Sequence, residues 1–178
     1  MTVARPVVLC ISGVDPTGAA GLHAEIDVLH GLGVHAISLV TALTVQDTHN
    51  VTAVLPVAVD TLAAQWAALQ ADGIRPDAVK VGLVANAEQA TWIAEQVKAL
   101  GVPMVVDPIL RAGGGAGLSS RDALAPLLRA ATLLTPNLDE AAALLDLPTD
   151  RADMAARLRA LWGVDAVLVT GGDTQDES

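Results

Sequence analysis

Aromatic residues and cysteine are scarce in this chain of 178 residues. It contains no Phe, no Tyr and three Trp, so the hydrophobic core has to be built mainly of Leu, Val, Ile and Ala. Its one cysteine, Cys10, lies inside an apolar run and has no second thiol for an intramolecular disulfide. We interpret Cys10 as a buried small hydrophobic residue and not as a nucleophile. The single cysteine fits a reducing compartment, and we expect a cytoplasmic location.

Basic residues are also in the minority. Ten Lys and Arg stand against 20 Asp and Glu, which gives a formal net charge of -10. This charge argues against nucleic acid or an anionic membrane as the main partner. The chain has no uninterrupted apolar stretch near about 18 residues and no basic segment that leads into one, so we expect no membrane span and no secretory signal. A phosphorylated ligand stays compatible, because backbone N–H groups and a metal ion can hold phosphate on an acidic protein.

Apolar runs typical of buried strands alternate with segments of helical periodicity. The runs predict strands at residues 7–11, 36–43, 51–57, 78–84, 104–106, 132–134 and 167–169. The segments between them predict helices near residues 22–32, 62–69, 93–100, 124–128, 140–145 and 154–162. This alternation indicates an α/β fold, with a mostly parallel central sheet and helices on both faces. The length favours a single domain over residues 1–178.

Polar residues and glycines collect where the predicted strands end. They are Asp15, Gln46, Asn86, Asp107, Asn137 and the pair Gly171 and Gly172. Ligands of parallel sheets bind beyond the carboxyl ends of the strands, so we expect Gln46, Asp107 and Asn137 to gather at one edge. The glycine-rich turn at residues 12–21 is neither a P-loop nor a dinucleotide fingerprint, because the required spacings are absent. The four histidines show no metal-ligand spacing, and we interpret them as surface or turn residues.

Five segments at these strand ends carry a resemblance to a known family. They read SGVDPTGAAG at residues 12–21, TALTVQDT at 41–48, VKVGL at 79–83, VDP at 106–108 and TPNLDEA at 135–141. In this order and spacing they resemble the hydroxymethylpyrimidine/phosphomethylpyrimidine kinase family of the ribokinase-like superfamily. The resemblance implies ATP-dependent phosphorylation of 4-amino-5-hydroxymethyl-2-methylpyrimidine, and then of its monophosphate, in thiamine diphosphate biosynthesis. It also implies ATP and Mg²⁺ as cofactors.

The resemblance assigns five residues to the pyrimidine substrate. Gln46 matches the family glutamine that reads the aminopyrimidine, and a side-chain amide suits this task because it both donates and accepts hydrogen bonds. Gly13, Leu83 and Ile109 match positions that line the pyrimidine pocket, with Leu83 in place of the usual methionine. Glu25 stands where the family usually has an aspartate near the substrate hydroxymethyl group. Without the resemblance, Gln46 is a polar cap of a strand end and Glu25 is a solvated helix residue.

The resemblance also implies a metal site and a nucleotide site. Asp107 matches a carboxylate that helps to hold Mg²⁺ near the phosphates, and a turn-forming Asp-Pro is the alternative. Asn137 and Glu140 match the side of the family that binds ATP, and their spacing is equally that of a helix capping box. Thr170 and Gly172 match a nucleotide-side strand end that often reads Lys-Gly-Gly, so one phosphate contact is missing in this chain.

One family segment is not found within residues 1–178. In the family, a later Gly-x-Gly-Cys-like or Ser-Gly-Cys segment supplies an anion hole and the catalytic base. We therefore expect the catalytic residues beyond Ser178, with residues 1–178 as the N-terminal two-thirds of one ribokinase-like kinase domain, lacking its anion-hole and adenine-covering part and inactive alone. Two alternatives stay open, a pyridoxal or pyridoxine kinase and a non-catalytic pyrimidine-binding remnant. A homodimer is the candidate assembly.

Overall fold

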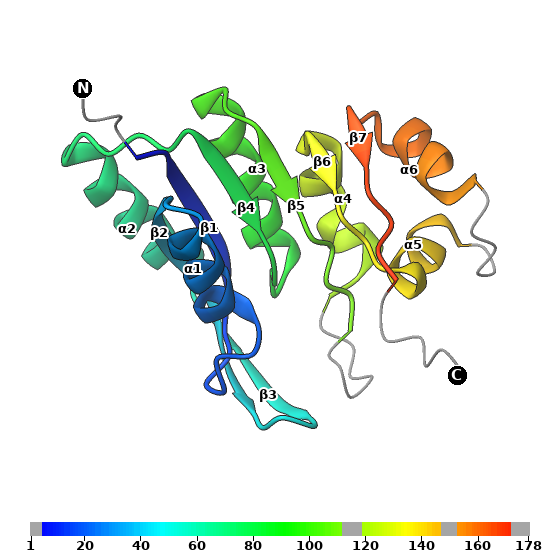
Figure 1. Cartoon of the computed structure of the whole chain (residues 1–178), viewed down its shortest axis with the longest axis horizontal. Coiled ribbons are helices and arrows are strands. Elements are labelled where there is room, and N and C mark those ends of the chain that lie inside the picture. Colours follow the sequence, from blue (N-terminus) through cyan, green and yellow to red (C-terminus); the bar gives the residue numbers. More distant parts are fainter. Residues whose placement is uncertain (1–4, 112–118, 147–152, 172–178) are drawn as a thin grey trace.

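The computed structural model of the chain describes residues 5–111, 119–146 and 153–171. Its centre is a seven-stranded sheet with the strand order β3-β2-β1-β4-β5-β6-β7 (Figure 1). The strands are β1 (Val7–Val14), β2 (His35–Gln46), β3 (Val51–Pro56), β4 (Ala78–Val81), β5 (Met104–Val106), β6 (Leu133–Leu134) and β7 (Ala166–Val167). Every neighbouring pair runs parallel except β2 and β3. The mostly parallel sheet predicted from the sequence is confirmed.

β3 runs antiparallel because only residues 47–50 separate it from β2. So short a turn can join antiparallel neighbours, whereas a parallel neighbour needs a crossover of a dozen or more residues. Within the turn, the Asp47 carboxylate accepts the backbone N–H groups of His49 and Asn50, both at 2.8 Å. The pairing register shifts between Val45 and Gln46, at the end of β2. The hairpin therefore carries Gln46 on an irregular strand end, and it extends past the other strands at the bottom of Figure 1.

Six helices lie in the described part of the chain. They are α1 (Gly21–Gly31), α2 (Val59–Ala71), α3 (Ala87–Leu100), α4 (Arg121–Ala130), α5 (Leu138–Leu145) and α6 (Met154–Trp162). Each helix that the periodicity predicts is found. α3 shows the signals at both ends: the Asn86 side chain accepts the Gln89 N–H at 2.9 Å, and Gly101 follows the helix with a left-handed backbone (φ 68°).

Helices cover both faces of the sheet, as predicted. Along β1, Leu9 and Ile11 belong to the hydrophobic cluster shared with α2, α3 and α4. Cys10 lies between them and points to the opposite face, because side chains alternate along a strand. α1 contacts β1 and β2 (Figure 1), and its Glu25 pairs with Lys80 of β4 on this second face. The sheet thus separates an apolar core from a face that carries charge.

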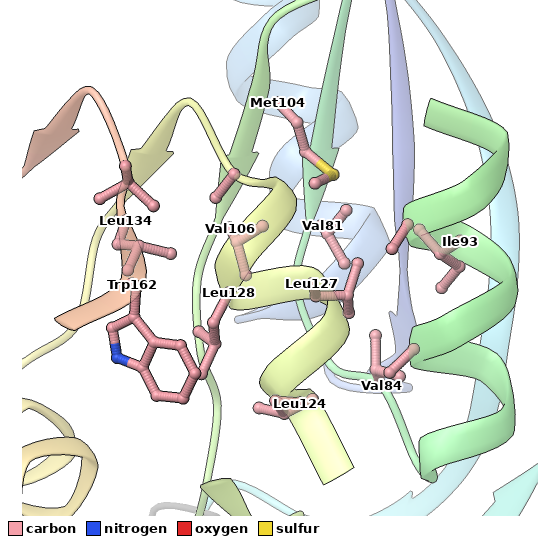
Figure 2. Packing of buried hydrophobic residues seen from close by; sticks show 14 of the residues in the cluster. Val81, Val84, Ile93, Met104, Val106, Leu124, Leu127, Leu128, Leu134 and Trp162 are labelled. Carbon is pink, nitrogen blue, oxygen red and sulfur yellow. The ribbon is translucent and has the colours of Figure 1, made fainter. Parts of the chain in front are cut away.

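The core between the sheet and helices α3 and α4 is aliphatic. Figure 2 shows strand side chains meeting helix side chains there, among them Val81, Val106, Ile93, Leu124 and Leu127. Trp66 and Trp162 are also buried, at 3% and 6% exposure, and add the aromatic area that the core lacks elsewhere. The predicted core of Leu, Val, Ile and Ala is confirmed, with these two tryptophans included.

Cys10 has the character predicted from the sequence. It is fully buried. Burial raises the pKa of its thiol to about 12, and the nearby Glu25 carboxylate adds to this shift while Lys80 opposes it. The thiolate is the nucleophilic form of cysteine, so a thiol with this pKa stays inert at neutral pH.

Candidate functional site

The chain reverses sharply after β1, in the turn between Asp15 and Gly21. Asp15 is 5% exposed. Its carboxylate accepts the N–H groups of Thr17 and Ala20 at 2.7 and 3.0 Å, and the Thr17 hydroxyl at 2.8 Å. Gly21 has a φ of 60°, and a Cβ there would lie 2.5 Å from the carbonyl oxygen of Gly13. Only glycine fits this position, and the turn packs back against the end of β1.

A pocket of about 170 Å³ opens beside this turn, where β1, β2, β4 and β5 end. It is lined by Ser12, Gly13, Val14, Asp15, Ala20, Gly21, Thr44, Gln46, Val51, Leu83, Ile109 and Arg111. Pockets for drug-sized ligands typically measure about 300–1,000 Å³, so this one suits a single small ring. Four of the five residues that the resemblance assigns to the substrate line it together, namely Gln46, Gly13, Leu83 and Ile109. Glu25 is not among the lining residues.

Leu83 is fixed in the pocket wall by its neighbours in β1 and β2. Its N–H donates to the Ser12 hydroxyl at 3.1 Å, and its carbonyl oxygen accepts the Thr41 hydroxyl. Ser12 and Thr41 are fully buried. A Cβ on Gly13 would lie 2.7 Å from Leu83 Cδ2, so the glycine leaves the room that the leucine side chain fills. The apolar wall of the pocket is therefore held before any ligand arrives.

Gln46 lines the same pocket as Asp15. Burial raises the pKa of Asp15, but hydrogen bonds from the Gln46 side chain, Thr17 and Ala20 outweigh burial and hold the pKa below its ordinary value. An ionised carboxylate can only accept, so the Gln46 amide nitrogen is the group that turns toward Asp15. The sequence predicts Asp15 at a strand end and assigns it no role. Its position two residues after the predicted turn glycine was the available signal.

Glu25 lies outside the pocket lining, in a cluster of charges. Its Oε1 pairs with Lys80 Nζ, and Lys80 Nζ lies 3.9 Å from Asp107 Oδ2. The Glu25 side chain is 13% exposed, and its Oε2 is buried without a hydrogen-bond partner in the described residues. The alternative interpretation of Glu25 as a solvated helix residue is therefore wrong. Its contact with the substrate hydroxymethyl group stays a prediction.

Lys80 is the member of this cluster that the sequence analysis missed. It joins Glu25 of α1 to Asp107 after β5, although it comes from the middle of β4. A Cβ on Gly82 would lie 2.9 Å from Lys80 Nζ and 3.0 Å from Glu25 Oε1, so this glycine makes room for the ion pair. A lysine inside an otherwise apolar strand was the signal, because a buried cation needs a counter-charge.

Asp107 follows β5 at the expected edge of the sheet. Burial raises the pKa of its carboxyl, the Lys80 charge opposes this shift, and the Glu25 charge adds to it. The described residues contain no group of three or more His, Cys, Asp or Glu side chains that could hold a metal ion. A single carboxylate still fits Mg²⁺, which is often bound by one or two carboxylates together with substrate phosphates and water.

The residues predicted for the nucleotide side meet at the start of α5. Asn137 Oδ1 accepts the Glu140 N–H and Glu140 Oε2 accepts the Asn137 N–H, both at 2.9 Å, so the predicted capping box is confirmed. Thr170 forms a parallel bridge with Asn137. Burial raises the pKa of Glu140, the Asn137 N–H opposes this shift, and the Asp107 charge adds to it. This charge effect links the start of α5 to the predicted metal site. Gly172 lies outside the described residues.

Replacing Asn137 by alanine is expected to lower the free energy of unfolding by about 1 kcal/mol, because α5 loses its N-cap. Urea denaturation of the purified variant measures this loss. Asn137→Asp keeps the acceptor oxygen and is the matched control, with stability near that of the parent. An alanine variant as stable as the parent would contradict the role of the cap. We also expect weaker nucleotide binding in the alanine variant, measured by calorimetry.

The sequence profile of the family described as Phosphomethylpyrimidine kinase matches residues 15–178. This chain belongs to the phosphomethylpyrimidine kinase family. The hydroxymethylpyrimidine/phosphomethylpyrimidine kinase of Rhizobium meliloti (strain 1021) is 38% identical over 174 residues, which cover 93% of this chain and 65% of the relative. The chain thus spans less than two thirds of the length of that relative. The family resemblance stated from the sequence is confirmed.

Solved structures of phosphomethylpyrimidine kinases and pyridoxal kinases share the fold. The phosphomethylpyrimidine kinase from Clostridium difficile 630 superposes with a TM-score of 0.83 at 29% identity, covering 98% of this chain and 78% of that one. The pyridoxal kinase from Staphylococcus aureus in complex with AMP-PCP and pyridoxal gives a TM-score of 0.81 at 29% identity, covering 98% of this chain and 65% of that one. The predicted ribokinase-like α/β architecture is confirmed.

A second, larger groove in this member of the phosphomethylpyrimidine kinase family lies away from the strand ends. It measures about 520 Å³ and runs between α3 and α4, and none of the predicted site residues lines it. All four histidines are exposed, as the sequence predicts. No helix within the described ranges is long and apolar enough to cross a membrane.

Proposed function

We propose that this chain binds 4-amino-5-hydroxymethyl-2-methylpyrimidine and serves its ATP-dependent phosphorylation, followed by that of its monophosphate, in thiamine diphosphate biosynthesis. The observation that carries the proposal is the convergence of Gln46, Gly13, Leu83 and Ile109 on one small pocket. These residues come from four strand ends that are far apart in the sequence. Membership of the phosphomethylpyrimidine kinase family supports the proposal, because relatives of that name are 34–40% identical over almost the whole chain.

In the proposed complex, different pocket residues bind different parts of the pyrimidine. Gln46, turned by Asp15, uses its amide to donate to a ring nitrogen and to accept from the neighbouring amino group. Leu83 and Ile109 supply the apolar wall against the ring. Glu25 is proposed to reach the hydroxymethyl group from outside the pocket lining, because its carboxylate and the hydroxyl of the pocket residue Ser12 both lie within 3.0 Å of the position that a Cβ on Gly82 would occupy.

The start of α5 is the proposed nucleotide side. Asn137, Glu140 and Thr170 lie together there, and the free N–H groups of a helix start favour the negative charge of phosphate. We include Gly172 in this side on the sequence pattern alone. Asp107 is the residue that would hold Mg²⁺, which neutralises phosphate charge when bound. Lys80 keeps the Asp107 carboxylate in place on the face of the sheet.

A pyridoxal kinase is the second candidate function. The observation in its favour is the likeness to the Staphylococcus aureus pyridoxal kinase, whose structure holds pyridoxal and AMP-PCP. Pyridoxal carries a phenolic hydroxyl and an aldehyde and has no amino group beside its ring nitrogen. An amide oriented as in Gln46 therefore matches the aminopyrimidine better.

Calorimetric titration of the chain with hydroxymethylpyrimidine and with pyridoxal tests the proposal. We expect the pyrimidine to bind more tightly, because it satisfies both ends of the Gln46 amide. Tighter binding of pyridoxal would contradict the proposal and support the second candidate. We expect no turnover with ATP and Mg²⁺ in the same samples, because the catalytic residues are expected beyond Ser178, and steady multiple turnover by residues 1–178 would contradict that expectation.

We also propose that residues 1–178 belong to one ribokinase-like domain and that the protein works in the cytoplasm. The one hydrophobic cluster, which runs from β1 to α6, supports the single domain. The free, buried Cys10 supports a reducing compartment. A homodimer stays the candidate assembly, and its test is the mass of the protein in solution.

A further inference from the structure

Arg111 gives the pyrimidine pocket its positive charge. It follows the pocket residue Ile109 in the segment after β5, and its side chain is exposed at the pocket. Among the pocket-lining residues it is the one cation, and Asp15 is the one anion. The family resemblance assigns neither residue to a ligand. The proposed recognition of the pyrimidine ring therefore does not involve the positive charge of Arg111 at the pocket.

The Arg111 side chain also differs from the other charged groups around the site in its lack of hydrogen-bond and ion-pair partners among the described residues. The Asp15 carboxylate accepts hydrogen bonds from Thr17 and Ala20. Lys80 is paired with Glu25. For the Arg111 guanidinium, the described residues offer no hydrogen bond and no ion pair. An unpaired cation beside a pocket is a ready contact for an anionic group of a ligand.

The surroundings make a local cation favourable for binding of an anionic ligand. The chain carries a formal net charge of -10, and Asp15, Glu25 and Asp107 all lie near the pocket. A negatively charged ligand is repelled by these carboxylates unless a local cation compensates. Guanidinium suits phosphate, because its planar fork donates two parallel hydrogen bonds to phosphate oxygens.

We propose that Arg111 binds the phosphate of a phosphorylated pyrimidine, so that the pocket accepts the monophosphate as well as the free hydroxymethyl compound. This inference rests on the proposed function, since it takes the ring position in the pocket as given. The phosphate that meets Arg111 has a second conceivable source, the terminal phosphate of the nucleotide. Titration of each ligand alone separates the two sources.

Arg111→Gln removes the charge and keeps most of the side-chain length. We expect its affinity for the pyrimidine monophosphate, measured by calorimetry, to fall by about ten- to a hundredfold, the loss of a charge-assisted contact. Affinity for the free hydroxymethylpyrimidine and for ATP should stay within about twofold of the parent, which is within the scatter of a surface substitution. Arg111→Lys should retain part of the affinity, because lysine keeps the charge without the fork. Arg75→Gln, at an exposed position outside the pocket, is the matched control.

Four results would overturn the inference. If Arg111→Gln leaves the affinity for the monophosphate unchanged, Arg111 does not contact the phosphate. If the variant loses equal affinity for both pyrimidines, Arg111 supports the pocket wall and does not recognise the phosphate. A loss confined to ATP assigns the phosphate to the nucleotide. A parent chain that binds neither pyrimidine contradicts the proposed function itself, and the inference falls with it. Thermal unfolding of each variant shows that the exposed substitution leaves the fold intact.

Discussion

Replacing Lys80 by methionine is expected to lower the free energy of unfolding by about 3 kcal/mol, the low end of the loss typical of a broken buried ion pair. Lys80 and Glu25 are only 27% and 13% exposed, so water replaces little of the lost attraction. Methionine keeps most of the volume and none of the charge. The Glu25 carboxylate then stays beside Asp107 with no cation between them, and like charges raise the free energy of the folded state.

Urea denaturation at neutral pH measures the free energy of unfolding of the parent, of Lys80→Met and of the variants below that serve as controls. Glu25→Gln together with Lys80→Met removes both charges, and we expect it to recover most of the stability lost in the single variant. Lys98→Met, at an exposed position of α3, is the matched control and should unfold like the parent. A Lys80→Met protein within about 0.5 kcal/mol of the parent, the range of ordinary surface substitutions, would show that the cluster does not stabilise the fold.

Gln46→Leu is expected to weaken binding of the aminopyrimidine by about ten- to a hundredfold. Leucine keeps similar bulk but offers no hydrogen bonds, so the ring nitrogen and the amino group of the ligand are buried without partners. An unsatisfied buried polar group costs about 1–3 kcal/mol, which sets the expected range. Calorimetric titration measures the loss directly.

Nucleotide affinity is the internal control for Gln46→Leu, because Asn137 and Thr170 lie at other strand ends than β2. We expect it to stay unchanged. Gln70→Leu, at an exposed position of α2, is the matched surface control. A Gln46→Leu variant that binds the pyrimidine as tightly as the parent would remove the substrate assignment and strengthen the pyridoxal kinase as the function.

The fold was predictable where local patterns determine it. Apolar runs and helical periodicity gave the strands and helices in the right order, since burial of one face imposes a period of two or 3.6 on the sequence. The direction of β3 was not predicted, because it depends on the length of the turn at residues 47–50 and not on the apolar pattern. β4 ends at Val81 and not at residue 84, and Leu83, which follows two residues later, lines the site instead.

The candidate site was predictable only where a motif marks it. Gln46 and Leu83 were found through family segments that can be read locally. Lys80 was inside one of those segments, yet its role depends on Glu25, 55 residues away, and on Asp107 after the next strand. Arg111 was missed because the pocket it borders exists only in three dimensions. Pairings across such distances follow from the topology of the sheet, which a single sequence does not reveal.

The place of β1 between β2 and β4 sets the order in which the pocket can form. β2 pairs with β1, and β3 with β2, within the first third of the chain, whereas β4 pairs with β1 across 70 residues, as Val8 opposite Ala78 shows. Closing the longer loop carries the larger entropy penalty and slows the formation of these contacts. The wall that contains Leu83 and Ile109 therefore joins Gly13 and Gln46 late in folding. Binding of the proposed pyrimidine ligand would consequently report the pairing of β1 with β4, and a chain that had formed only β1, β2 and β3 would give no signal in a ligand titration.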